Sequence, residues 1–298
     1  MKKIKLKKGK SLEESLSGHT AQVEDKKGVE VAGDSKVGLH LKVFESFLDE
    51  GLGSIVRARY EKLKGLLGIL TPGEAEILLQ ASLAYVNEKD PDNIFGEFFR
   101  RVIQTSYGAG HNDFEFDLSL FGKDDATPIF ALEGKEHPGP KLKIKIKSYA
   151  LPKDIFIASS YVEAIVEGDV GKNFAYLFKV SNAHIKGKAS YGLGHTAVSS
   201  KFFVEGDVDH NCGYKSSDCY FDLRGKVNGF CLANKSDHST FRIEDLSRDY
   251  KIGKESRICK FISPNEEVIK SFYDRVPRGQ ENRIFRELED GKLQEVTR

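Results

Sequence analysis

The chain has 298 residues, a formal net charge of +1 at pH 7, and 39% apolar against 31% charged residues. This composition is typical of a folded protein, and the balanced charge gives no overall field that would attract nucleic acid or a membrane surface. No segment approaches the roughly 18 apolar residues that a membrane-spanning helix needs. The cysteines lack the C-x-x-C spacing of zinc or iron–sulfur sites. We therefore expect a cytoplasmic protein with reduced thiols, no cofactor and no membrane contact.

The N-terminal part of the chain is predicted to be helical after a polar lead segment. Residues 1–38 are basic and polar, with six lysines among the first ten residues, and we interpret them as a solvated tail. Apolar residues then recur at helical spacing over 39–110. Thr71-Pro72-Gly73-Glu74 is a capping box, and Asp90-Pro91 opens a further helix that Gly108 and Gly110 end. We predict a helical module over 39–110, whose last helix is buried.

Near Asn112 the pattern changes from helical spacing to alternation, which predicts strands. Phe114, Phe116 and Leu118 share one face, and a later strand alternates apolar residues with lysines. The lysines of that later strand are Lys141, Lys143, Lys145 and Lys147. Such a face could attract a polyanion, but lysines on an early strand also prevent edge-to-edge pairing with another molecule. We favour the second interpretation and do not expect nucleic acid as a partner.

The C-terminal half carries a repeat of 19 residues, marked by four glycines with matched neighbours. These are Gly168, Gly187, Gly206 and Gly225. The residues two before and two after each glycine are apolar in every copy, so even offsets face inward across a strand. We predict an α+β chain in which a parallel, right-handed β-solenoid occupies 111–246, with regular 19-residue turns over 160–246. Each glycine permits a bend or a close backbone approach at a corner.

The sequence predicts that the solenoid ends near residue 246, because the fifth turn lacks its glycine. Residues 247–298 are interpreted as a cap. Ser263-Pro264-Asn265-Glu266 opens a helix, and Asp290-Gly291 lies between two short strands as in a hairpin. Such a cap would cover the open end of the solenoid.

The residues flanking each glycine are charged, and their sign reverses from one copy to the next. This charge ladder comprises Glu167, Asp169, Lys186, Lys188, Glu205, Asp207, Arg224 and Lys226. Residues one period apart would lie roughly 4.8 Å apart on neighbouring turns, so alternating signs give each charge opposite partners. We interpret the ladder as a device that sets strand register.

The segments Val204–Tyr214 and Leu223–Phe230, with the pattern Val-Glu-Gly-Asp-Val and Leu-Arg-Gly-Lys-Val, resemble the GXGXG β-helix family. That domain ends the large subunit of glutamate synthase and forms a subunit of formylmethanofuran dehydrogenase. The resemblance covers about residues 160–245 and implies a right-handed β-helix that organises neighbouring domains or subunits while the chemistry is carried elsewhere. The glycine pair that the family places before each returning strand is replaced here, for example by Lys179-Val180.

Candidate sites on the solenoid are few, and we assign no catalytic residue. Cys219 and His238 share one column of the repeat, so they are the one pair that could start a metal site, although two ligands do not close one. Tyr176, His195 and Tyr214 also share a column and could bind a sugar or a base, although stacked packing is the commoner role. Paired carboxylates occur at Glu167 and Asp169, but basic neighbours would hold them ionised.

The sequence therefore favours a non-catalytic solenoid scaffold or interaction module that binds a protein partner or a second copy. Two alternatives stay open. One is a structural subunit of a redox or amidotransfer complex, as the GXGXG resemblance implies. The other is a carbohydrate-binding or carbohydrate-active β-helix.

Overall fold

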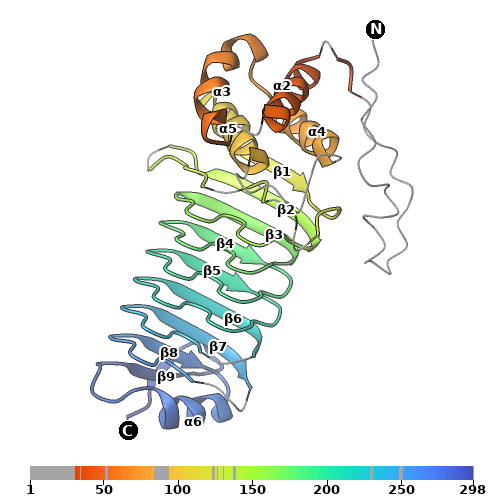
Figure 1. Cartoon of the computed structure of the whole chain (residues 1–298). Coiled ribbons are helices and arrows are strands. Elements are labelled where there is room, and N and C mark those ends of the chain that lie inside the picture. Colours follow the sequence, from red (N-terminus) through yellow and green to blue (C-terminus); the bar gives the residue numbers. More distant parts are fainter. Residues whose placement is uncertain are drawn as a thin grey trace.

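The computed structural model describes residues 31–33, 35–50, 53–83, 94–122, 125, 127–129, 131–136, 139–228, 231–247 and 251–297 (Figure 1). Predictions for residues 1–30, Asp90-Pro91, Gly229-Phe230 and residues 248–250 fall outside these ranges. The described helices are α2 (Lys36–Glu50), α3 (Gly53–Leu67), α4 (Pro72–Ser82), α5 (Ile94–Gly108) and α6 (Glu266–Arg275). The described strands are β1 (Asp113–Asp117), β2 (Leu142–Ala150), β3 (Val162–Asp169), β4 (Asn182–Ile185), β5 (Lys201–Val204), β6 (Tyr220–Val227), β7 (Thr240–Leu246), β8 (Lys260–Ser263), β9 (Arg283–Glu287) and β10 (Leu293–Glu295). The structure confirms a parallel β-solenoid preceded by helices.

Helices α2 to α5 pack around a cluster of phenylalanines. The ring centroids of Phe44 and Phe98 lie 5.1 Å apart, and those of Phe95 and Phe99 lie 4.9 Å apart, with all four rings buried. The predicted capping box of α4 is confirmed, and α5 is buried as predicted. Among the helices of the described residues, none is both long and apolar enough to cross a bilayer.

Helix α4 closes the first edge of the sheet. Gln80 Nε2 donates to the carbonyl of Asp117 at 2.7 Å, and Glu76 Oε1 accepts from the N–H of Asp117 at 3.2 Å. An edge strand otherwise leaves such groups free to pair with another chain. The helical module therefore ends the solenoid as well as preceding it.

In the described part of the chain, ten strands form one sheet in chain order, and each neighbouring pair from β1 to β9 is parallel. We call a strand with the turn that follows it a rung. In the middle rungs the partners keep the interval of the repeat: Ala164 pairs with Ala183, which pairs with Phe202, which pairs with Phe221. The apolar columns that the repeat predicted therefore stack on one another.

The register then changes by one residue. Val208 and Val227 are still partners at the interval of the repeat, but the N–H of Ala233 donates to the carbonyl of Cys212, which stacks Leu232 over Cys212. One extra residue thus lies between Val227 and Leu232. Leu232 therefore continues the inward column of Cys212, and Cys231 is only partly buried.

The solenoid continues beyond residue 246, so the prediction that it ends there is wrong. Phe241 pairs with Phe261, and Phe261 pairs with Ile284, all in parallel register. The intervals between these partners are unequal and longer than 19 residues, so no constant period is visible in the sequence there. The inward positions are nevertheless still apolar. Only the last strand, β10, is antiparallel to its neighbour, and it forms with β9 the predicted hairpin.

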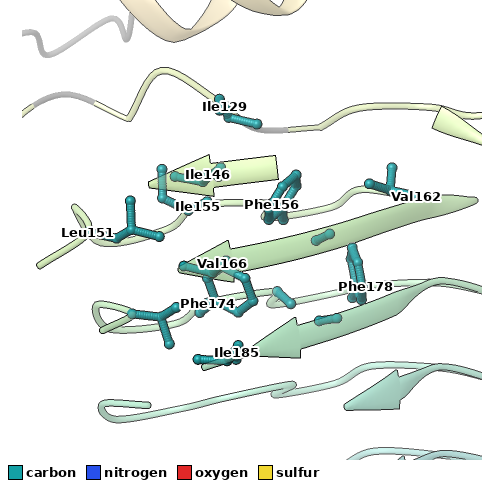
Figure 2. Packing of buried hydrophobic residues seen from close by; sticks show 14 of the residues in the cluster. Ile129, Ile146, Leu151, Ile155, Phe156, Val162, Val166, Phe174, Phe178 and Ile185 are labelled. Carbon is teal, nitrogen blue, oxygen red and sulfur yellow. The ribbon is translucent and has the colours of Figure 1, made fainter. Parts of the chain in front are cut away.

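The interior is filled by inward side chains from successive rungs. Figure 2 shows Val166 and Ile185 from neighbouring strands with Phe156, Phe174 and Phe178 from the turns. Farther along, the rings of Phe202, Phe221 and Phe241 stack nearly parallel, with centroids 4.7 and 4.8 Å apart and interplanar angles of 8° and 3°. Burial of such rings supplies most of the free energy that stabilises the stacked rungs.

The repeat glycines lie where successive backbones come closest. A Cβ at Gly206 would be 2.5 Å from the carbonyl oxygen of Gly187, and one at Gly225 would be 2.2 Å from that of Gly206. The N–H of Gly206 donates to the same Gly187 carbonyl at 3.1 Å. A side chain at these positions would force the rungs apart, so close approach is the role of these glycines.

The wall opposite the sheet is built from turns that use left-handed backbone at alternate residues. In one turn Asn173, Ala175 and Leu177 have φ between 55° and 58°, and Val180 has φ 47°. Equivalent residues of the neighbouring turns repeat this conformation, although few are glycine. Each non-glycine residue there costs roughly 1–2 kcal/mol, which the regular hydrogen bonds between rungs must offset.

Helix α6 packs against the last rungs of the sheet. Its N-cap is Asn265, whose Oδ1 accepts from the N–H of Glu267, and Ser263 Oγ in turn accepts from the N–H of Asn265. Val268, Ile269 and Phe272 are buried, and the Phe272 ring lies 5.6 Å from that of Phe261. The predicted helix therefore forms, and its apolar face meets the last inward phenylalanine of the solenoid.

We expect the free energy of unfolding to decrease as the pH falls below about 6.5, the ordinary pKa of histidine. His40 of α2 is 1% exposed, and its Nδ1–H donates to the carbonyl of Lys36 at 2.8 Å. Burial lowers the pKa of His40 in the folded chain, so the unfolded chain binds the proton first. As the pH falls, the loss of stability begins near the pKa of His40 in the unfolded chain. It stops growing once the pH is below the pKa of His40 in the folded chain.

Urea unfolding at pH 7.5, 6.5 and 5.5 measures this loss. The variant His40→Gln should lack that component and show a shallower decrease. Equal decreases in both proteins would contradict the assignment.

Candidate functional site

The charges of the repeat form one continuous row along the outer face of the sheet. We call it the strand row: Asp117, Lys147, Glu167, Lys186, Glu205, Arg224 and Glu244, one on each rung from β1 to β7. Asp117 pairs in register with Lys147, and Lys147 with Glu167. Lys186 Nζ lies 3.0 Å from Glu167 Oε1. The alternation of sign thus extends beyond the glycine-marked repeat at both ends.

Members of the strand row also have partners outside it; for example, Lys147 Nζ lies 2.6 Å from Glu115 Oε1. Glu205 Oε1 lies 2.7 Å from Nε2 of His184, and the Arg224 guanidinium lies over the ring of Phe203 at 4.3 Å. His184 in turn meets the Phe203 ring edge to face at 4.9 Å. We call the outer face of the sheet the outer wall. Its middle is therefore a packed surface in which charged and aromatic side chains cover one another.

A second row follows the corner beyond the glycines. We call it the corner row: Asp169, Lys188, Asp207, Lys226 and Asp245. Its carboxylates bind backbone: Asp169 Oδ1 accepts from the N–H of Lys188 at 2.8 Å, and Asp207 Oδ1 from the N–H of Lys226 at 3.0 Å. These bonds tie each rung to the next, so the acidic residues of this row have a structural use.

The electrostatics of the rows do not suit acid catalysis. The ammonium group of Lys186, with Lys145 nearby, holds the pKa of Glu167 below its ordinary value. A carboxyl that acts as a general acid needs a raised pKa, so that it keeps its proton near neutral pH. Burial or an acidic neighbour raises the pKa in this way. Glu167 with Asp169, and Glu205 with Asp207, are instead surrounded by hydrogen bonds and cations of the neighbouring rungs.

The structure separates Cys219 from His238. Because of the extra residue after Val227, the N–H of Cys219 donates to Oγ of Ser239, and Ser239 occupies the rung position predicted for His238. Cys219 is 3% exposed and burial raises the pKa of its thiol to about 11, whereas His238 is about half exposed and contacts Asp237. Within the described residues, no three His, Cys, Asp or Glu side chains come together as a metal ion would require.

The structure does bring Tyr176, His195 and Tyr214 together. His195 contacts both tyrosines edge to face, with ring centroids 4.9 and 4.7 Å away. Partial burial and the nearby Lys215 ammonium lower the pKa of His195, which favours its neutral form. The three rings form a short aromatic column on the turn wall, and they are half-buried against one another.

Two of the hollows on the surface of the described residues are lined in part by groups of the rows and of the α4–β1 contact. A shallow groove of about 360 Å³ follows the corner row, with Asp169, Lys188 and Asp207 among its lining residues. A second hollow of about 570 Å³ lies where α4 meets β1, beside Glu76 and Asp117. Burial raises the pKa of Glu76, but its Oε1 accepts from Gln80 and from the N–H of Asp117. Glu76 therefore closes the sheet edge through Oε1, while its other carboxylate oxygen, Oε2, is buried without a hydrogen-bond partner among the described residues.

Sequence reasoning missed one polar cluster. Arg242 of β7 donates to Asp222, Glu244 and Glu287 at 2.8 to 2.9 Å. These contacts join the wall to the end of β9, and they hold the pKa of Arg242 above its ordinary value even though burial opposes that shift. The three carboxylates lie at unrelated distances from Arg242 along the chain, so no fixed interval could have revealed them.

No protein-family model, curated protein or solved structure matches this chain. The fold alone defines its class, a parallel β-solenoid protein with helices before the first strand. The two charged rows, the aromatic column and the stacked glycines recur from rung to rung along this solenoid.

Proposed function

We propose that the chain is a non-catalytic scaffold whose outer wall binds protein, either a partner or a second copy of the chain. The observation that carries this proposal is the strand row, because it forms an ordered surface one rung after another instead of gathering around a cavity. Helix α4 contacts β1, and α6 contacts β7, β8 and β9, so these helices pack at the two ends of the wall. Extended regular walls are the surfaces that solenoids use for binding.

The GXGXG resemblance would make this scaffold a structural subunit of a redox or amidotransfer complex. The close stacking of Gly206 and Gly225 on successive rungs supports that proposal, because the segments that carry the resemblance contain these two glycines. Right-handed winding, a 19-residue turn as the repeat unit, α6 with the β9–β10 hairpin as a cap, and a cytoplasmic location belong to the same proposal. The free cysteines are in keeping with a reducing compartment.

A second candidate function is carbohydrate binding on the aromatic column, which the juxtaposition of Tyr176, His195 and Tyr214 favours. Sugars stack on the faces of aromatic rings. The edge-to-face packing covers part of these faces, which ranks this candidate second. A melting temperature that rises with one glycan of a panel in wild type but not in Tyr176→Ala would support it, and no rise with any glycan would dismiss it.

The scaffold proposal is tested by capturing the tagged chain from cells that also contain an untagged copy. We expect stoichiometric recovery of a protein, either a partner or the untagged copy. The wall variant Lys201→Glu with Lys260→Glu should reduce that recovery, because both lysines are exposed on the outer face of the sheet. The matched control, Lys179→Glu with Lys254→Glu on the turns, should not. Equal recovery with both variants would overturn wall binding, and so would recovery of no protein together with a chain that stays monomeric in solution.

A further inference from the structure

We infer that the outer wall pairs with the outer wall of a second copy, antiparallel, about a two-fold axis that runs along the strands midway between β4 and β5. This inference rests on the proposed function and names the partner of the wall. It comes from the strand row, whose signs alternate from β1 to β7. An axis between two rungs matches odd rungs with even ones, so each charge of the strand row from β2 to β7 meets an opposite charge.

The pairs that this axis creates can be named. Lys186 faces Glu205 of the second copy, Glu167 faces Arg224, and Lys147 faces Glu244, each twice by symmetry. The corner row obeys the same axis, because Lys188 then faces Asp207 and Asp169 faces Lys226. Both rows are therefore complementary in one arrangement, and a two-fold contact of this kind closes without further growth.

The other outward residues of the wall tolerate this arrangement. His184 faces Phe203 of the second copy, which extends the edge-to-face contact that the two side chains make within the chain. The one like-charged match is Lys145 with Arg242. Each of these already has carboxylate partners in its own chain: Glu115 and Glu167 for Lys145, and Asp222, Glu244 and Glu287 for Arg242.

The spacing of the charges selects a second copy over other occupants. Rungs repeat about every 4.8 Å, so like charges recur about every 9.6 Å along the row. Side chains on one face of an extended peptide recur about every 6.8 Å and would lose register within a few residues. A nucleic-acid strand carries only negative charge and would meet repulsion at every acidic rung. A second solenoid has the same spacing and the opposite sign at each contact.

The contact is expected to be weak and sensitive to salt. Six rungs by about five strand residues give a wall of roughly 500 Å² per copy, or about 1,000 Å² in total. That total lies at the lower limit for a specific interface. Complementary charges then determine how the two copies align and contribute less to the affinity between them. Salt weakens these charge interactions by screening.

Sedimentation equilibrium of the full chain at 50 and 500 mM NaCl tests the association. We expect a monomer–dimer equilibrium whose Kd increases about tenfold or more at the higher salt concentration. A monomer at both salt concentrations, up to about 0.5 mM protein, would overturn the inference. A dimer that salt does not weaken would also overturn it, since the charges would then not carry the contact.

Cysteine cross-linking tests the geometry in a Cys231→Ser background, because the remaining cysteines are buried. Facing residues of two sheets that pack face to face lie about 10 Å apart, which is too far for a disulfide, so a bis-maleimide cross-linker of about that span is used. Glu167 and Arg224 of one chain are three rungs apart, roughly 14 Å, which is beyond that span. Glu167→Cys with Arg224→Cys in the same chain should give a covalent dimer with this cross-linker. Each single variant should stay monomeric. The axis places the thiol of one chain three rungs away from the same thiol of the other chain, which is too far to be joined. A dimer from either single variant, or none from the double variant, would overturn the antiparallel arrangement.

These outcomes are distinct from failure of the proposed function. If the chain is monomeric but a different protein is recovered through the wall in the capture experiment, the scaffold proposal stands and the inferred dimer is wrong. If neither the untagged copy nor another protein is recovered, and sedimentation equilibrium also shows a monomer, both are wrong.

Discussion

Replacing Phe221 with alanine is expected to lower the free energy of unfolding by about 3–5 kcal/mol. The Phe221 ring is fully buried and stacks on Phe202 and Phe241, at 4.7 and 4.8 Å between centroids. Its removal leaves a cavity between two rings that neighbouring rungs hold in place, because the backbone spacing of the solenoid cannot collapse. Urea unfolding followed by circular dichroism measures the change.

Phe203→Ala is the matched control, because Phe203 directly follows the inward Phe202 and therefore points outward. Its ring is half-buried and is covered by Arg224. Losing that contact should cost about 1 kcal/mol. If Phe203→Ala and Phe221→Ala lose equal stability, the inward stack of rings does not carry the stability assigned to it.

Gly206→Ala is expected to cost about 3 kcal/mol or more, or to prevent folding. The added Cβ would lie 2.5 Å from the carbonyl oxygen of Gly187 and 2.8 Å from the N atom of Lys188. Both are backbone atoms, which cannot rotate away as the end of a side chain would. The neighbouring rungs would have to separate and weaken their hydrogen bonds, so thermal unfolding should begin well below that of the wild type.

Gly65→Ala in α3 provides the opposite control. A Cβ there meets nothing within 4 Å, and alanine favours a helix over glycine by about 1 kcal/mol. This variant should therefore be stabilised slightly. Equal tolerance of alanine at positions 65 and 206 would show that the close approach of the rungs is not a constraint on the fold.

The repeat could be predicted from the sequence because inward columns and the glycines recur at a constant interval over the middle rungs. The same regularity gave wrong predictions where it broke. One extra residue between Val227 and Leu232 shifted the columns that follow it as far as Ile243, which moved Ser239 into the place predicted for His238. An insertion of a single residue has no signature of its own, because only the pairing of strands shows where it lies.

The extent of the solenoid was predicted too short for a related reason. Longer and unequal turns connect Phe241, Phe261 and Ile284, so the interval changes while the inward apolar character does not. The strand row was likewise recognised only in part, since Asp117 and Lys147 are partners in the sheet but lie much farther apart in the chain than one repeat. The left-handed turn residues such as Ala175 and Leu177 could not be predicted, because their types do not favour that conformation.

The candidate sites depended on the same columns. Tyr176, His195 and Tyr214 lie before the register shift, and the structure brings them into contact as their interval indicated. Arg242 and Glu76 act through residues distant in sequence, so their roles became visible only with the fold.

One continuous stack of parallel rungs from β2 through β8 underlies every column and row described above, and a distance between spin labels tests it most directly. Lys143 and Lys260 are exposed on the outer wall, in the same column of stacked residues, and are six rungs apart. Labels at Lys143→Cys and Lys260→Cys, in a Cys231→Ser background, should give a narrow distribution of distances near roughly 29 Å. A broad distribution, or a maximum far from that value, would contradict the continuous solenoid.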